Sequence, residues 1–328
     1  MVVSAGTDIS AVAAKAGKID KSGNEQAMKV VYSEQYDLNL GTHVFPSTKY
    51  RLIKERLLEE NVIRPEDIVE PSPASDDDVA LVHDGDYIWK LKNAKLSYVE
   101  ILRMEVPYSP ELVRAVWLSA GGSILAGRLA LEEGIGVNIG GGFHHAFPDH
   151  GEGFCVIHDV AVAIRRLQKD GHIERAMTFD CDVHQGNGTA AIFGADETVY
   201  TVSIHQENNY PYPKPPSNLD VNLHNGVQDT EYLTVLEDSL DQALAEFDPQ
   251  VIFYLAGADP YGEDQLGGLK LTLQGLEHRD RIVFEKARAK NIPVAVTFAG
   301  GYARHVADTV RIHCNTIRTA AEFTNLKQ

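Results

Sequence analysis

Four short apolar segments, separated by longer helical patterns, constrain the fold of this 328-residue chain most strongly. They are rich in β-branched residues and read GIGVNIG at 134–140, RAMTFD at 175–180, VIFYLAGAD at 251–259 and PVAVTFAGGY at 293–302. Runs of this kind are typical of strands that are buried on both faces of a parallel sheet. Their alternation with helices predicts an α/β chain whose central parallel sheet is flanked by helices on both faces.

Helical patterns fill the intervals between these segments. The clearest has Ser109 as N-cap and Pro110 at the first helical position, and Gly134 suits its end. Further helices are expected near residues 47–60, 157–169, 229–247, 272–290 and 303–323. We find no internal repeat and no low-complexity linker, so a single domain is expected over residues 28–328. Residues 1–27 are small, polar and without a clear period, which predicts a mobile N-terminal tail.

Charge and apolar composition limit the classes of function. The chain has 30 basic and 47 acidic residues and a formal net charge of −17. This charge disfavours nucleic-acid binding and would attract cationic substrates, although solubility alone also explains it. No apolar run approaches the roughly 20 residues of a membrane span, and the N-terminus lacks a signal-peptide block, so a cytoplasmic protein is expected. The three cysteines match no zinc-knuckle or redox spacing and are interpreted as reduced packing residues.

Each of the four apolar segments ends in polar or glycine-rich residues. In open parallel sheets the ligand site lies beyond the carboxyl ends of the strands, so these endings are expected to converge. The side chains that would meet there are His144, His145, Asp180, Asp182, His184, Asp259 and Tyr302. A functional site is therefore predicted at this edge of the sheet.

The segment FDCDVHQGNG indicates a metal site. Residues at i, i+2 and i+4 of an extended segment share one face, so Asp180, Asp182 and His184 can point the same way. The alternative is that they cap a helix starting near Gly188. Asp259 is interpreted as the end of a very apolar strand, where an unpaired carboxylate would be costly. Asp182, His184 and Asp259 would leave a fourth position for water, as in catalytic zinc sites, although this ligand set also suits Fe(II).

Two adjacent histidines follow a glycine-rich turn in NIGGGFHHAFPDHGEGF, residues 138–154. Histidine titrates near neutrality, so His144 and His145 could supply the base and the acid that a metal-activated water requires. Asp180 and Asn187 are distinct partners, and the imidazole that faces the carboxylate would be held more cationic. A tight turn whose histidines merely pack is the alternative. The glycines miss the spacing of a nucleotide fingerprint, and no G-x-S-x-G elbow occurs.

Aromatic residues complete the candidate site. Tyr302 follows two glycines, and its phenol could polarise a substrate carbonyl opposite the metal, while packing on the following helix is the alternative. Phe143 and Phe154 flank the histidines and could line a slot for a slim aliphatic chain, or pack in the core. In isolation, the sequence leaves both interpretations open.

Taken together, the motifs resemble the histone deacetylase family of zinc-dependent amidohydrolases. GGGFHHA, GFC, DCDVHQGNGT, GADPYGEDQLGGLKLT and GGY occur in the family's order, and the resemblance runs from about Val30 to the C-terminus. It implies the arginase-deacetylase fold, with about eight strands in the parallel sheet. Finer features, such as Phe rather than Trp at position 143, resemble the class IV branch and its bacterial relatives.

The resemblance implies a role for each candidate residue. Asp182, His184 and Asp259 would bind one zinc ion, and His144 and His145 would form a dyad with His145 as the principal base and acid. Asp180 would support His144, and Tyr302 would stabilise the oxyanion. Asn187 departs from class I, which has a second aspartate there, and agrees with classes II and IV. The acyl-lysine tunnel would be formed by Phe143, Gly153 and Phe154, with Tyr210 as a further wall.

The resemblance also implies a cofactor, substrates and inhibitors. A structural potassium ion would be held near the zinc site by Asp180, Asp182, His184, Ser203 and Ile204. The expected substrate is an acyl-lysine of a protein or peptide, with acetylpolyamines or other small N-acyl amines as the alternative, and hydroxamate-type inhibitors are expected to bind. An arginase-type enzyme with two manganese ions is a rival, but residues 183–189 offer no extra aspartate. A non-catalytic acyl-lysine scaffold is the other rival. Loss of activity in such proteins usually removes a metal ligand or the tyrosine, whereas the three ligands and Tyr302 are all present here.

Overall fold

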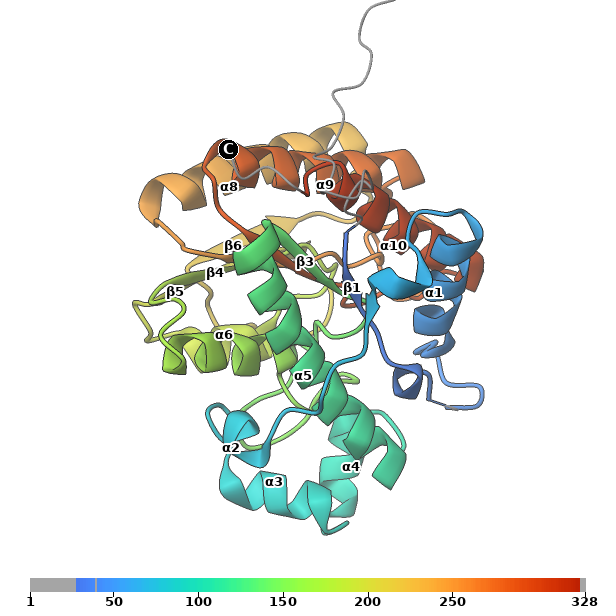
Figure 1. Ribbon diagram of the computed structural model, residues 1–328, viewed down its shortest axis with the longest axis vertical. Coiled ribbons are helices and arrows are strands. Elements are labelled where there is room, and N and C mark those ends of the chain that lie inside the picture. Colours follow the sequence, from blue (N-terminus) through green and yellow to red (C-terminus); the bar gives the residue numbers. More distant parts are fainter. Residues whose placement is uncertain (1–27, 39, 325–328) are drawn as a thin grey trace, which may run out of the picture.

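The computed structural model describes residues 28–38 and 40–324. The predicted N-terminal tail, residues 1–27, lies outside the described residues. An eight-stranded sheet forms the centre of the molecule, and its neighbouring strands are parallel (Figure 1). The strand order is β2-β1-β3-β8-β7-β4-β5-β6. The strands are β1 (Val30–Val31), β2 (Ile68–Val69), β3 (Ile135–Asn138), β4 (Ala176–Asp180), β5 (Val199–Gln206), β6 (Leu219–Leu223), β7 (Ile252–Leu255) and β8 (Val294–Thr297).

The four strands that the sequence predicted stand side by side in the middle of this sheet. They are β3, β8, β7 and β4, and every residue in them is buried. Their register keeps the carboxyl ends level, because Leu255 of β7 pairs with both Asp180 of β4 and Thr297 of β8. The loops that leave these strands therefore emerge next to one another at one edge.

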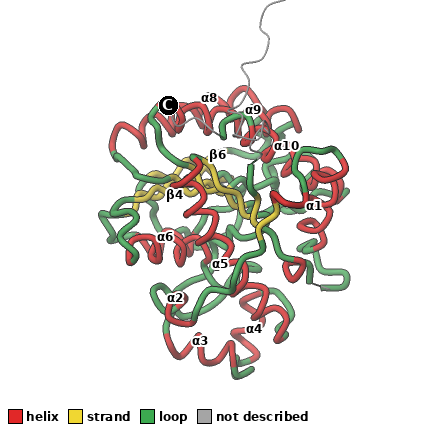
Figure 2. The backbone as a smooth tube through the Cα atoms, viewed as in Figure 1, coloured by secondary structure: helices red, strands yellow, loops and turns green. Residues whose placement is uncertain are grey.

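Helices cover both faces of the sheet, as expected (Figure 2). One face carries α1 (Thr48–Glu59), α8 (Asp229–Glu246), α9 (Leu273–Ala289) and α10 (Val306–Ala321). The other carries α5 (Pro110–Glu133) and α6 (Asp159–Lys169), with the short helices α2 (Asp76–Val79), α3 (Gly85–Lys92) and α4 (Tyr98–Met104) beyond them. The remaining helical elements are α7 (Asn187–Phe193) and the 3₁₀ turns η1 (Glu34–Tyr36) and η2 (Pro65–Asp67). None of the described helices is long and apolar enough to cross a membrane.

The long helix α5 begins and ends where its sequence signals predict. The Ser109 hydroxyl accepts a hydrogen bond from the backbone N–H of Leu112, and Pro110 occupies the first turn. Gly134 ends the helix with a φ of 92°, a backbone conformation that favours glycine. This ending turns the chain directly into β3, so the cap of α5 fixes where the central strand starts.

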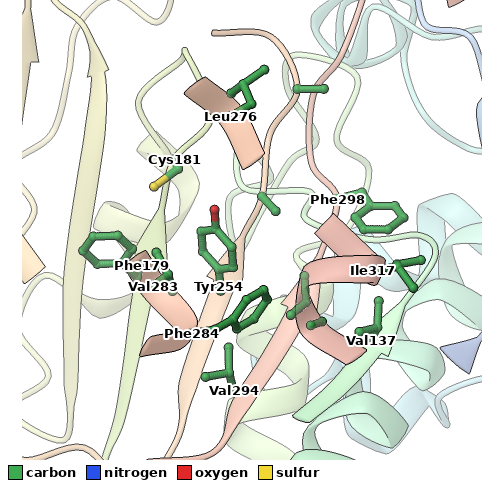
Figure 3. Packing of buried hydrophobic residues seen from close by; sticks show 14 of the residues in the cluster. Val137, Phe179, Cys181, Tyr254, Leu276, Val283, Phe284, Val294, Phe298 and Ile317 are labelled. Carbon is green, nitrogen blue, oxygen red and sulfur yellow. The ribbon is translucent and has the colours of Figure 1, made fainter. Parts of the chain in front are cut away.

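Apolar side chains pack against both faces of the sheet. Figure 3 shows part of the larger cluster, in which the ring of Tyr254 in β7 contacts both Phe179 of β4 and Phe284 of α9. The Tyr254 and Phe284 rings meet edge to face with centroids 6.0 Å apart. Burial of each such side chain contributes about 1.5–3 kcal/mol. All three cysteines are buried and free, which confirms them as packing residues.

Two strands end earlier than the sequence predicted. β7 ends at Leu255 and β8 at Thr297, so Asp259 and Tyr302 lie in the loops that follow and not at the ends of the strands. Beyond these ends the two loops stay joined, because the N–H of Ala258 donates to the carbonyl of Gly300 at 2.9 Å, but they must also make room for the Asp259 side chain. A Cβ on Gly300 would lie 1.9 Å from Oδ2 of Asp259. The glycine leaves the space into which the carboxylate points.

Candidate active site

The loops after β3, β4, β7 and β8 bring the predicted polar side chains together. His144 and His145 come from the β3 loop, Asp182 and His184 follow β4, Asp259 follows β7 and Tyr302 follows β8. All of these residues are at most 7% exposed. The convergence expected from the strand endings is therefore present in the structure.

Asp182, His184 and Asp259 form a compact buried group. One potential ligand atom from each lies within 4.8 Å of the other two. Backbone donors orient the carboxylates: the N–H of Gly300 donates to Asp182 Oδ2 at 2.7 Å, and that of Val183 donates to Asp259 Oδ1 at 2.8 Å. The other two oxygens face the imidazole of His184: its Nδ1 lies 3.0 Å from Asp182 Oδ1, which also accepts from the His184 backbone N–H, and 3.5 Å from Asp259 Oδ2.

This group fits a divalent cation. Oδ2 of Asp259 has no hydrogen-bond partner among the residues that the structure describes, and Nδ1 of His184 lies 3.5 Å from it. Burial, together with the nearby Asp182 carboxylate, raises the pKa of Asp259 to about 7. A cation would relieve this repulsion and satisfy the unpaired oxygen. Two carboxylates and one imidazole suit zinc, and they also suit Fe(II).

The alternative interpretation of the DCDVH segment is wrong. Helix α7 starts at Asn187 with Gly186 as its N-cap, and no side chain caps it. Asp180 instead accepts a hydrogen bond from the backbone N–H of Asp182 through Oδ1, at 3.0 Å. Its other oxygen faces His144.

The two histidines have different partners. Nδ1 of His144 lies 2.6 Å from Oδ2 of Asp180, and Nδ1 of His145 lies 2.6 Å from Oδ1 of Asn187. The two rings are 4.0 Å apart between centroids. Both partner oxygens are acceptors, so each Nδ1 is the protonated nitrogen. These contacts are not those of histidines that merely pack in a turn.

The partners separate the pKa values of the pair. Burial lowers the pKa of His144, but the carboxylates of Asp180 and Asp182 outweigh it and raise the value to about 9. Burial and the neighbouring cationic imidazoles of His144 and His184 hold the pKa of His145 well below its usual range. His145 is therefore neutral, with its proton on Nδ1 and a free lone pair on Nε2. The imidazole beside the carboxylate is the more cationic one, as expected from the sequence.

Backbone contacts fix Tyr302 at the edge of the same group. Its N–H donates to Oδ2 of Asp264 at 2.7 Å, and its carbonyl accepts from the side chain of Gln265 at 2.9 Å. Burial and the Asp182 and Asp259 carboxylates raise the pKa of Tyr302 well above its usual range. The phenol is therefore protonated and can act as a hydrogen-bond donor.

A pocket leads from the surface to this group. It is lined by Glu105, His145, Gly153, Phe154, His184, Asn209, Tyr210, Leu266 and Tyr302. Gly153 is required at its wall because a Cβ there would lie 2.9 Å from both the His145 ring and the Tyr210 hydroxyl. Phe143 lines a neighbouring apolar cavity, which shares Phe154 with the pocket. Of the four residues expected to form a tunnel, the structure thus places Gly153, Phe154 and Tyr210 at the pocket.

The residues expected to hold potassium lie beside the group. Asp180 of β4 pairs in register with Ser203 of β5, and Ile204 follows within the same buried strand. The Ser203 hydroxyl lies 3.0 Å from Nδ1 of His205. These contacts place the expected residues next to one another, and the potassium ion itself stays a prediction.

Sequence reasoning missed three charged residues at the site. Lys49 donates from Nζ to the carbonyl of Ala299 at 2.9 Å, and Asp264 holds the backbone of Tyr302. Glu152 accepts hydrogen bonds from Asn187 and Tyr210. The motif GEGF contained Glu152, but only the folded chain shows which side chains it meets.

Comparison with known proteins settles the family. The histone deacetylase domain matches residues 43–317 of the chain. The chain belongs to the histone deacetylase family. An uncharacterised protein of Picosynechococcus is 40% identical over 89% of this chain and 98% of its own. Histone deacetylase 2 of Arabidopsis thaliana is 34% identical over 86% of this chain and 78% of its own.

A solved structure of a histone deacetylase homologue, complexed with SAHA, has the same fold. Its TM-score is 0.75 at 24% identity, and the match covers 90% of this chain and 84% of the other. The parallel eight-stranded sheet is therefore the arginase-deacetylase fold of the histone deacetylase family. The fold and the family that the motifs predicted are both confirmed.

Proposed function

We propose that this histone deacetylase family member is a zinc-dependent hydrolase that removes an acyl group from lysine side chains of proteins. One observation carries the proposal: the buried group of Asp182, His184 and Asp259 lies beside the His144 and His145 pair at the inner end of a pocket. Among the described residues, no second group of three potential ligands lies as close together. This supports one metal ion and disfavours the arginase-type rival.

The protein's own groups would divide the proton transfers. His145 carries its proton on Nδ1, so its Nε2 can take a proton from the attacking water and return it to the leaving amine. His144, held cationic by Asp180, would stabilise the negative charge that develops beside the dyad during the reaction. The Tyr302 phenol would donate to the oxyanion. Zinc, bound by Asp182, His184 and Asp259, would polarise the amide carbonyl and lower the pKa of water.

The pocket supports a slim acylated chain as the substrate. Phe154 and Tyr302 meet edge to face with ring centroids 5.8 Å apart, and Tyr210 stands against the ring of His145. SAHA, a hydroxamate, is bound by the solved homologue, and we infer that hydroxamates bind here as well. Fe(II) in place of zinc, the potassium ion and a cytoplasmic location stay predictions.

An acetylpolyamine or another small N-acyl amine is the second candidate substrate. It is favoured by the carboxylate of Glu105, which lines the pocket, and by the net charge of −17, which would attract a cation. The two candidates differ in what surrounds the scissile amide and not in the chemistry. A substrate panel therefore separates them.

The experiment uses acetyl-, octanoyl- and myristoyl-lysine peptides and acetylputrescine, each with and without a hydroxamate. Metal content is measured in parallel. We expect hydrolysis by protein that holds one zinc ion, inhibition by the hydroxamate, and loss of both metal and hydrolysis in Asp182→Ala. Tyr302→Phe should retain zinc and lose roughly 10²-fold in turnover, the scale of one oxyanion donor.

Other outcomes would count against the proposal in distinct ways. Deacylation by Asp182→Ala without detectable metal would end it. Unchanged turnover in Tyr302→Phe would remove that phenol from the mechanism. Two metal ions per chain would favour the arginase-type rival, and peptide binding without hydrolysis would favour the non-catalytic scaffold.

A further inference from the structure

Glu152 links the two groups that flank His145. Its Oε1 accepts a hydrogen bond from Nδ2 of Asn187 at 2.7 Å and another from the hydroxyl of Tyr210 at 2.8 Å. The side chain of Glu152 is 22% exposed, so both bonds are partly shielded from water. One carboxylate oxygen thus contacts both neighbours of the proposed base.

The first link fixes the orientation of the Asn187 amide. An ionised carboxylate only accepts hydrogen bonds, so the amide must turn its NH₂ toward Glu152. Its Oδ1 then faces the opposite side, where it accepts from the backbone N–H of Gly188 at 3.1 Å and meets Nδ1 of His145 at 2.6 Å. A reversed amide would place NH₂ against Nδ1 of His145 and would favour the opposite imidazole tautomer.

The second link fixes the ring of Tyr210. The Tyr210 and His145 rings meet nearly perpendicular, at 79°, with centroids 4.9 Å apart. The bond from the Tyr210 hydroxyl to Glu152 holds this ring in place. Tyr210 therefore limits the rotation of His145 from one side while Asn187 holds it at Nδ1.

We propose that Glu152 is a positioning residue that sets the tautomer and orientation of His145 through Asn187 and Tyr210. The inference deepens the proposed function, because it rests on His145 as the base. An aspartate at position 187 would accept a bond from His145 in either orientation. The neutral amide of Asn187 has an accepting oxygen and a donating NH₂. A further group must therefore determine which of the two faces His145.

The other contact of Glu152 does not explain this geometry. Nε2 of His150 lies 3.5 Å from Oε2 of Glu152, whereas both bonds toward the site use Oε1. The His150 ring stacks on Phe147, outside the group around His145. A purely structural role for Glu152 would act on stability and would not depend on the residue at position 187.

The experiment measures kcat and KM of the zinc-loaded protein with a fluorogenic acetyl-lysine peptide. We expect Glu152→Ala to lower kcat roughly 10-fold or more, the scale of losing an outer partner of a site residue, with zinc content unchanged. Glu152→Gln should recover most of kcat, because the amide oxygen can accept both bonds. Glu66→Ala, which removes an equal charge from an exposed side chain, is the matched control.

The decisive comparison repeats Glu152→Ala in an Asn187→Asp background. There the loss in kcat should fall to less than about 2-fold, because the carboxylate needs no orientation. An equal loss in both backgrounds would overturn the proposal. So would a loss in Glu152→Gln as large as in Glu152→Ala, or an effect on KM alone.

The tautomer provides a readout that does not depend on activity. Long-range ¹H–¹⁵N spectra of histidine-labelled, zinc-loaded protein should show the Nδ1–H tautomer of His145, assigned by its absence in His145→Asn. Glu152→Ala should weaken this preference, and an unchanged tautomer would contradict the proposed role. If the wild-type protein binds zinc but hydrolyses no substrate, the proposed function fails and the spectra still test the positioning.

Discussion

Lys49 is fully buried beside the candidate site, although lysine is almost never buried unless it is paired. Its Nζ lies 5.4 Å from the ring centroid of Tyr50 and 5.9 Å from that of Tyr302, and it donates to the carbonyl of Ala299. Ala299 has a φ of 50°, a left-handed conformation that costs free energy for a residue with a Cβ. The lysine thus stabilises the strained start of the loop that carries Tyr302.

The protonation of Lys49 makes stability depend on pH. Burial lowers the pKa of Lys49 from 10.5 to about 8, although the Asp259 and Asp182 carboxylates partly oppose the change. Between these two pH values the unfolded chain binds more protons than the folded chain, so this lysine makes stability rise with pH. Relative to Lys49→Met, the wild-type free energy of unfolding should rise by about 3 kcal/mol between pH 7.5 and 10.5.

The measurement is urea denaturation of both zinc-free proteins across this pH range. Taking the difference between wild type and Lys49→Met cancels the titration of groups that do not interact with Lys49. A difference that stays constant with pH would show that the amine has the same pKa in the folded and in the unfolded protein. A difference that falls with pH would contradict the sign of the shift.

Single residues of the site were predictable where the sequence places them directly after a recognisable strand. Asp180 is the last residue of β4, and Asp182 and His184 follow it directly, so predicting the strand also predicts where these three residues lie. Lys49 and Glu152 were not predictable in this way. Lys49 meets Ala299 across 250 positions, and Glu152 meets Tyr210 across 58, so their roles depend on how distant loops pack.

At the scale of elements, the central strands were predictable because both of their faces are buried. β3, β4, β7 and β8 therefore consist almost entirely of apolar residues. β1 and β2 have two residues each, too few to produce a pattern. β5 is fully buried but contains Thr, Ser, His and Gln. Its sequence therefore lacks the continuous apolar run by which a buried strand is recognised. The helices α2 to α4 have at most eight residues, less than a window in which a helical period is evident.

The loops after β7 and β8 depend on glycine for their mutual approach. A Cβ on Gly300 would lie 1.9 Å from Oδ2 of Asp259 and 2.5 Å from Oδ2 of Asp182. The N–H of the same glycine orients Asp182. Gly300 thus combines a hydrogen-bond donor with the space that two carboxylates require.

We therefore expect Gly300→Ala to displace the metal ligands while the sheet stays folded. The added methyl group must push at least one carboxylate away, so zinc affinity should fall by 10-fold or more, the scale of losing correct ligand support. Zinc titration with a competing chelator measures this, and circular dichroism monitors the fold. Gly85→Ala is the matched control, because no atom lies within 4 Å of its added Cβ. Equal zinc affinity in both variants would contradict the close approach.

At the scale of the whole molecule, the sheet and the net charge act together on the substrate. Helices cover both faces of the sheet (Figure 1), and the pocket of the candidate site is lined by residues of the loops at its carboxyl edge. Glu105 stands in this pocket, and the chain as a whole carries a formal charge of −17. An acidic protein with its pocket at one edge should attract cationic ligands toward that edge.

This charge predicts a preference among acyl-lysine peptides that share one acyl group. At low salt, a peptide flanked by lysines should have a kcat/KM roughly 10-fold higher than one flanked by glutamates, since steering acts on the encounter. The ratio should fall toward unity as sodium chloride rises to about 0.5 M, where the Debye length is only a few ångströms. Initial rates at several salt concentrations measure it, and a neutral peptide flanked by glycines provides the reference. A ratio that persists at high salt would instead indicate direct contacts between the flanking residues and the rim of the pocket.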